Sequence, residues 1–200
     1  KAALRRRLRI PEGRPIVAYL GLLTDYQGIP HLLQAARELV SAGKNAHFLI
    51  MGYPDVARYQ AMANHMGIGG WVTFTGKVEY RYAPLYLSLG DVGVAPKMSS
   101  TEGSGKLLNY MALAQPVVAY DTAVHREYLA DYGVYAPAGD VTAFAKAVDD
   151  LLCHPARMVE LGRSLRQRAE TAYSWQAASQ KIITLYQYLT CLLYTSPSPR

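Results

Sequence analysis

Six short apolar runs, separated by longer amphipathic stretches, constrain the fold of this 200-residue chain more than any other feature. The runs are rich in Val, Ile, Leu, Ala and Tyr, and they occupy residues 16–20, 47–51, 72–75, 92–95, 116–120 and 134–136. Most are nearly continuous rather than alternating, which is typical of strands that are buried on both faces. Such strands belong to parallel sheets that helices cover from both sides.

The stretches between these runs have helical periodicity. One apolar stripe recurs at helical spacing between residues 32 and 40 and ends before Gly43. Further helices are predicted near residues 56–66, 83–89, 106–114, 124–130, 141–152, 155–172 and 175–189, with Asp140 as an N-cap. The alternation predicts an α/β fold, a Rossmann-like parallel sheet of about six strands with helices on both faces.

In a sheet of this kind, ligands bind beyond the carboxyl ends of the strands. This rule nominates the segments that follow the apolar runs: residues 21–28, 52–55, 76–80, 96–106 and 121–125. Four of the five contain glycine, which allows a backbone to approach a ligand closely.

Length and charge limit the classes of function. A chain of 200 residues is enough for one domain, and no apolar run approaches the ~18 residues of a membrane span. The net charge of +6 lies mainly in two arginine clusters, within residues 5–9 and 157–168. We interpret them as solvated helix faces, or alternatively as a surface that attracts anionic lipid headgroups, with peripheral association at a membrane, or a phosphorylated substrate. Nucleic acid is not expected as a partner, since no recognition motif accompanies the charge. We expect a cytoplasmic protein, with the inner face of the membrane as the alternative location.

The most informative segment is residues 95–112, APKMSSTEGSGKLLNYMA. A strand ends at Ala95, and a helix is predicted to begin near Gly105 or Lys106. The turn formed by Gly103, Ser104 and Gly105 leaves backbone amides free at the start of that helix, where phosphate binds readily. Lys106 adds a full positive charge. A plain helix cap is the alternative interpretation.

Other phosphate, metal and nucleophile motifs do not fit. Ser100 stands where a P-loop needs glycine, and Leu107 stands where it needs Ser or Thr. The sequence contains no dinucleotide fingerprint, no Asp-x-Asp metal motif and no Gly-x-Ser-x-Gly elbow. The five histidines share no ligand spacing, so no metal-ligating residues are predicted.

The last ten residues, CLLYTSPSPR, follow a helical pattern that ends near Leu189. They have no periodicity of their own and resemble the translation of a sequencing adapter. We predict that residues 191–200 are a non-native tail, with a disordered Ser/Pro-rich tail as the alternative.

Four blocks occur in a fixed order along the chain: IVAYLGLLTDYQGIPHLLQA (16–35), FLIMGYP (48–54), VTFTGKV (72–78), and residues 102–112 followed by PVVAYDT (116–122). Together they resemble the donor domain of family 4 glycosyltransferases, the C-terminal half of a GT-B fold. The resemblance covers about residues 4–189. It implies an interdomain linker over residues 1–14 and a nucleotide-sugar-binding domain over residues 15–190.

The resemblance also implies site residues. Glu102 corresponds to a catalytic glutamate that contacts the donor sugar, and the block around residues 76–78 borders the nucleobase. The implied donor-binding residues are Gly21, Leu22, Gln27, Gly28, Lys77, Val78, Gly103, Ser104, Gly105, Lys106 and Asn109. No cofactor is implied beyond the nucleotide-diphosphate sugar itself, and the acceptor is expected on an N-terminal domain outside this chain.

Three positions depart from the family pattern. Leu22 and Gln27 stand where the family usually has an Arg and a Lys that contact the diphosphate, and Asn109 stands where a Glu usually accepts bonds from ribose. Lys106, with Lys97 or Lys77, is expected to compensate for the two missing cations.

Three functions remain open at this point. The favoured one is a retaining, metal-independent sugar transferase, of which this chain alone would be inactive. The alternatives are a degenerate, non-catalytic nucleotide-sugar-binding module and another GT-B enzyme, such as a nucleotide-sugar epimerase.

Overall fold

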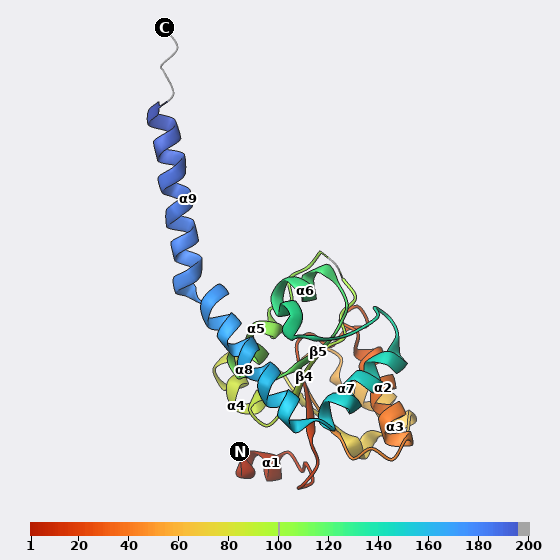
Figure 1. Cartoon of the computed structure of the whole chain (residues 1–200). Coiled ribbons are helices and arrows are strands. Elements are labelled where there is room, and N and C mark those ends of the chain that lie inside the picture. Colours follow the sequence, from red (N-terminus) through yellow and green to blue (C-terminus); the bar gives the residue numbers. More distant parts are fainter. Residues whose placement is uncertain (100, 196–200) are drawn as a thin grey trace.

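The computed structural model describes residues 1–99 and 101–195, and side chains up to residue 190. Within these residues one six-stranded sheet forms the centre of the fold (Figure 1). Its strands are β1 (Ile16–Leu20), β2 (His47–Met51), β3 (Val72–Gly76), β4 (Val92–Ala95), β5 (Val117–Tyr120) and β6 (Val134–Ala136). They lie in the order β3-β2-β1-β4-β5-β6, and every neighbouring pair is parallel. The predicted fold class and all six predicted strands are confirmed.

Most helices agree with the predicted pattern to within one or two residues. The exceptions are the helix at the C-terminal end, which is longer than predicted, and a short helix near the N-terminus, which was not predicted. They are α1 (Ala2–Arg7), α2 (Ile29–Ser41), α3 (Val56–His65), α4 (Ala83–Leu87), α5 (Lys106–Ala112), α6 (Ala123–Leu129), α7 (Val141–Leu152), α8 (Pro155–Ala172) and α9 (Trp175–Thr195). Short 3-10 turns lie at η1 (Gly69–Trp71), η2 (Tyr80–Tyr82) and η3 (Ala130–Tyr132). The predicted N-cap Asp140 accepts a hydrogen bond from the amide of Ala143 at 2.8 Å.

Two hydrophobic layers, one on each face of the sheet, explain why the strands read as continuous apolar runs. Successive strand residues point to opposite faces. Val17 and Tyr19 pack with α2, α3 and α7, whereas Ile16 and Ala18 pack with α4, α5 and α8. Each strand therefore needs apolar side chains at odd and even positions alike.

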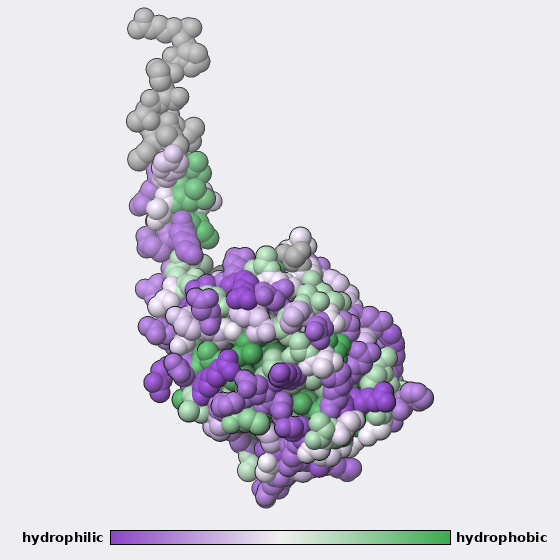
Figure 2. All heavy atoms as spheres, turned by 45° about the vertical axis from the view of Figure 1, so that its right-hand side comes forward, coloured by the Kyte–Doolittle hydropathy of each residue, from purple (hydrophilic) through white to green (hydrophobic). Residues whose placement is uncertain are grey.

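The C-terminal helix corrects one expectation. We predicted a helix that ends near Leu189, but α9 continues to Thr195, so residues 191–195 are helical. The non-native origin of residues 191–200 stays a prediction. Residues 196–200 of the predicted tail lie outside the described part. Figure 1 shows that α9 projects away from the sheet and its covering helices. Apolar side chains lie along one side of the projecting part (Figure 2), among them the exposed Ile182, Leu185 and Leu189.

The segment that we assigned to an interdomain linker, residues 1–14, contains the short helix α1. Arg5 on this helix donates two hydrogen bonds to the carbonyl oxygen of Pro11 and one to that of Arg14. In the second arginine cluster Arg166 pairs with Glu170, and Arg168 donates to backbone carbonyls of Glu127 and Tyr128. Several of the clustered arginines are thus engaged within the chain.

The strand order places a crevice at one point of the sheet. The chain runs outward from β1 to β3 on one side and from β4 to β6 on the other, so β1 and β4 flank the point where the order reverses. At such a point the loops that leave the two strands diverge and leave room for a ligand. Tyr110 of α5 connects β1 and β4 at this point. Its hydroxyl accepts a bond from the amide of Leu20 at 2.9 Å and donates to the carbonyl of Val94 at 3.3 Å.

Candidate functional site

A cleft of about 510 Å³ opens at this point of the sheet, beyond the carboxyl ends of the strands. The loops that follow β1, β3 and β4 supply most of its lining. Ten of the residues proposed for donor binding line it: Gly21, Leu22, Gln27, Lys77, Val78, Gly103, Ser104, Gly105, Lys106 and Asn109. The structure thus brings together three separate stretches of the sequence, within residues 21–27, 77–78 and 103–109, in one cleft.

Gly28 is the donor-site residue that does not line the cleft. It is the N-cap of α2, with a φ of 81°, and a Cβ atom there would lie 2.2 Å from the carbonyl oxygen of Pro96. Only glycine allows this close approach between the loops after β1 and β4. Gly28 therefore affects the cleft through the packing of these two loops, and not by lining it.

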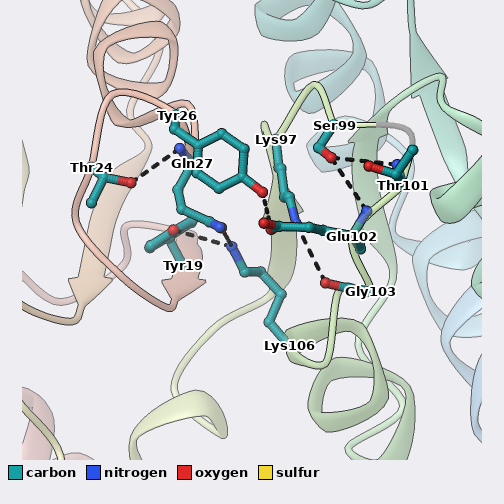
Figure 3. A network of polar contacts seen from close by, with 10 residues as sticks. All are labelled: Tyr19, Thr24, Tyr26, Gln27, Lys97, Ser99, Thr101, Glu102, Gly103 and Lys106. Carbon is teal, nitrogen blue, oxygen red and sulfur yellow. Dashed lines mark hydrogen bonds and ion pairs between the residues drawn. The ribbon is translucent and has the colours of Figure 1, made fainter.

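Lys106 is one of three charged residues that line the cleft, with Lys77 and Glu79. Its ammonium donates to the hydroxyl of Tyr19 at 3.1 Å and to the side-chain oxygen of Gln27 at 2.9 Å (Figure 3). Both partners are neutral, and no acidic group forms an ion pair with Lys106 in the described part of the chain. Loss of water around the ammonium, with the nearby charge of Lys97, lowers the pKa of Lys106 to about 7.

Gly21 determines how closely the first loop approaches this lysine. A Cβ atom at Gly21 would lie 3.0 Å from both Cε and Nζ of Lys106, and 3.0 Å from the hydroxyl of Tyr19. Such contacts are shorter than side chains ordinarily tolerate, so a larger residue would displace the ammonium. The glycine at the end of β1 therefore keeps Lys106 between its two neutral partners.

Glu102 lies beside the cleft in a separate polar network (Figure 3). Its Oε2 accepts a hydrogen bond from Lys97 Nζ at 2.6 Å and another from the hydroxyl of Tyr26. The Glu102 side chain is 59% exposed, whereas that of Lys97 is only 2% exposed. Burial lowers the pKa of Lys97 from its ordinary value.

The turn between Glu102 and α5 is the predicted phosphate-binding element. The amides of Gly103, Ser104 and Gly105 make no backbone hydrogen bond among the residues that the structure describes. The Ser104 hydroxyl is buried and has no partner there either. An unpaired buried hydroxyl costs about 1–3 kcal/mol, so this turn is suited to a ligand that accepts hydrogen bonds.

Asn109 lies one helical turn beyond Gly105, on the cleft side of α5. Its Nδ2 donates to the carbonyl of Gly105 at 3.3 Å. The amide oxygen has no recorded partner in the described chain, so it can accept a bond from a ligand hydroxyl.

The two uncharged replacements behave differently. Leu22 is 47% exposed at the cleft and adds no charge there. Gln27 accepts a hydrogen bond from Lys106 and so orients this cleft-lining lysine. Of the two lysines expected to compensate, Lys77 lines the cleft, with its Nζ 5.2 Å from the ring centre of Tyr53. Lys97 does not line the cleft, because it is bound beneath the Glu102 loop.

Sequence reasoning missed four tyrosines. Lys106 contacts Tyr19, and Glu102 contacts Tyr26. The cleft is lined by the other two, Tyr53 and Tyr80. The nominated loops 21–28, 52–55 and 76–80 contain three of these residues, so their place at the sheet edge was the available signal. What each side chain contacts depends on the packing of separate loops.

Among the described side chains, those of residues 1–99 and 101–190, no group of three or more His, Cys, Asp or Glu residues is arranged to hold a metal ion. Over the same residues, none of the helices combines the length and the apolar character that crossing a membrane requires.

A family model, Glycosyl transferases group 1, matches residues 1–172. The chain belongs to the group 1 glycosyltransferases. Among curated relatives it is 28% identical over 193 residues to an alpha-D-kanosaminyltransferase from Streptomyces kanamyceticus, with 94% of this chain and 49% of the relative covered. It is 24% identical over 196 residues to a GDP-mannose-dependent phosphatidylinositol monomannoside mannosyltransferase from Corynebacterium glutamicum, covering 94% and 51%.

Solved structures of glycosyltransferases have the same fold. A sucrose-phosphate synthase from Thermosynechococcus elongatus superposes with a TM-score of 0.83 at 26% identity, covering 96% of this chain and 49% of that one. HepE from Anabaena in complex with UDP has a TM-score of 0.83 at 14% identity, covering 94% and 52%. This group 1 glycosyltransferase chain thus spans about half the length of the relatives it matches.

Proposed function

We propose that this chain is the donor half of a family 4 glycosyltransferase with the GT-B fold. It binds a nucleotide-diphosphate sugar, and the sugar passes with retention to an acceptor held by an N-terminal domain outside this chain. The observation that carries the proposal is Lys106, a cleft-lining ammonium that has only neutral partners among the described residues.

The electrostatics of Lys106 support a site for an anion. A partly buried ammonium with neutral partners is poorly stabilised in its charged form, and the pKa of Lys106 is therefore lowered to about 7. A diphosphate beside it would favour the charged form and supply the missing counter-charge. The unpaired Ser104 hydroxyl and the free amides of the 103–105 turn lie in the same cleft.

These groups have defined roles in the proposed reaction. When the bond between the sugar and the diphosphate breaks, negative charge grows on the leaving group. Lys106, the Ser104 hydroxyl and the adjacent amides would stabilise that charge, so we propose a metal-independent transfer. Asn109 would accept a bond from the ribose, and Lys77 and Val78 would lie at the base. Glu102 would contact the donor sugar.

Leu22 and Gln27 favour a second candidate, a non-catalytic module that binds the nucleotide sugar. Neither side chain adds positive charge, so stabilisation of the departing diphosphate depends on fewer cations. In the favoured account, Lys106 with the Ser104 hydroxyl and the adjacent amides is sufficient to stabilise the departing diphosphate. In the alternative, the chain binds the donor and the complete protein transfers no sugar.

Calorimetry with UDP, GDP and ADP on the 200-residue chain tests the proposal. We expect one of the three to bind, and Lys106→Ala to weaken that binding by about 10- to 100-fold, the value of one charged hydrogen bond to phosphate. Absence of binding by a folded sample to all three would overturn it. Transfer of sugar by the 200-residue chain alone would contradict the assignment of the acceptor to a separate domain.

A further inference from the structure

Lys97 is a buried charge to which the proposed reaction gives no role. Only 2% of its side chain is exposed, and it does not line the cleft. Its Nζ lies 2.6 Å from Oε2 of Glu102, 3.3 Å from the carbonyl oxygen of Glu102 and 3.4 Å from that of Gly103. A buried ammonium is costly unless it is paired, and within the described residues the hydrogen-bond acceptors of Lys97 all belong to the turn that carries Glu102.

A second element contacts the same carboxylate oxygen. Tyr26, in the loop after β1, donates its hydroxyl to Oε2 of Glu102. Its ring lies 5.2 Å from the Nζ of Lys97, so tyrosine, lysine and glutamate converge at one point (Figure 3). The loops that leave β1 and β4, the two walls of the crevice, are thereby joined through one oxygen atom.

The two oxygens of Glu102 consequently differ. Oε2 receives both hydrogen bonds, whereas Oε1 has no recorded partner in the part of the chain that the structure describes. A carboxylate oxygen can accept further hydrogen bonds, and the Glu102 side chain is 59% exposed. Oε1 is therefore the atom that remains available to a ligand hydroxyl.

We infer that Lys97 and Tyr26 are positioning residues that anchor Oε2 of Glu102 and leave Oε1 to accept a hydrogen bond from a hydroxyl of the donor sugar. The inference rests on the proposed function and assigns the recognition of the sugar to a network outside the cleft. Neither residue contacts the sugar in this arrangement. Each acts through the orientation of the carboxylate.

The experiment measures how much the sugar contributes to the affinity for the nucleotide sugar. If Lys97 and Tyr26 only stabilised the fold, their loss would not change this contribution selectively. Calorimetry on the 200-residue chain first finds which of UDP, GDP and ADP binds. The ratio of the dissociation constant of that nucleotide to that of its sugar form is then measured with UDP-glucose, GDP-mannose or ADP-glucose. Glu102→Gln is the reference variant, Lys97→Met and Tyr26→Phe are the test variants, and Tyr82→Phe is a matched control at a tyrosine that is 45% exposed.

We expect Lys97→Met to lower this ratio by about fivefold and Tyr26→Phe by about two- to threefold, as one hydrogen bond on Oε2 is lost in each. Tyr82→Phe should leave the ratio unchanged, and the dissociation constant of the nucleotide itself should change by less than about twofold. Tyr26→Phe removes one oxygen from a half-exposed ring, so it decides the matter if Lys97→Met does not fold.

Two results would overturn the inference while leaving the nucleotide site in place. One is a wild-type ratio near unity, which would mean that the sugar adds nothing. The other is a ratio that falls in Glu102→Gln but persists in both test variants. Absence of nucleotide binding by the wild-type chain would instead overturn the proposed function itself.

Discussion

Two lysines at the carboxyl end of the sheet, Lys97 and Lys106, have opposite electrostatic surroundings. Burial lowers the pKa of both. Lys97 is paired with the Glu102 carboxylate at 2.6 Å, whereas the hydrogen-bond partners of Lys106 in the described part of the chain are the hydroxyl of Tyr19 and the amide oxygen of Gln27. The difference shows that the positive charge of Lys97 holds a turn, and it is the reason why we propose that the charge of Lys106 serves a ligand.

The largest expected effect comes from removing the partner of the buried lysine. Glu102→Ala leaves the Lys97 ammonium, 2% exposed, without a counter-ion, and we expect the free energy of unfolding at pH 7 to fall by about 3 kcal/mol. Denaturant unfolding measures it. The double variant Lys97→Met/Glu102→Ala should regain most of the loss, and a double variant as unstable as Glu102→Ala would show that the pair is not the cause.

The pH dependence of stability is the next largest effect. Since the pKa of Lys106 is about 7 in the folded chain and about 10.5 unfolded, the unfolded state binds more protons between these values. The wild-type chain should therefore gain about 2 kcal/mol of stability from this lysine as the pH rises from 7 to 9. In Lys106→Met this gain should disappear, as thermal unfolding at both pH values would show. An equal gain of stability in both proteins would show that a lowered pKa of Lys106 is not its cause.

Crowding the lysine should weaken nucleotide binding by a smaller amount. In Gly21→Ala the added Cβ would lie 3.0 Å from Nζ of Lys106 and would push the ammonium away from Tyr19. We expect the nucleotide affinity to fall by about 1.5 kcal/mol, measured by calorimetry. Gly70→Ala is the control, because a Cβ there would meet nothing within 4 Å. Equal affinities for the two variants would contradict the placement of Lys106.

The smallest expected effect is a gain. Leu22→Arg adds a further cation to the cleft, beside Lys77 and Lys106, at a residue that is 47% exposed. Nucleotide binding should tighten by about 0.5–1 kcal/mol at low salt and less at high salt. Leu85→Arg, at a residue that is 49% exposed but does not line the cleft, provides the control. Similar tightening in both would mean that only net charge matters.

The sequence predicted the sheet well, because strands covered on both faces must be apolar at every position, as in residues 47–51. It also placed the cleft, since loops after parallel strands meet at one edge of the sheet. It did not predict that Lys97 binds Glu102 rather than the cleft, or that Tyr26 joins them. Those contacts depend on how the loops after β1 and β4 fold over one another, and no periodicity encodes that. The predicted end of α9 was wrong because residues up to Thr195 lack the helical periodicity of polar and apolar residues on which the prediction of this helix was based.

Proton uptake on nucleotide binding tests the central claim most directly. At pH 8 most Lys106 side chains are neutral, since the pKa is about 7, and a diphosphate that accepts from the ammonium must restore its proton. Calorimetry in two buffers of different ionisation enthalpy should therefore show uptake of about one proton per nucleotide by the wild-type chain and none by Lys106→Met. Binding with the same proton uptake in both proteins would contradict the account.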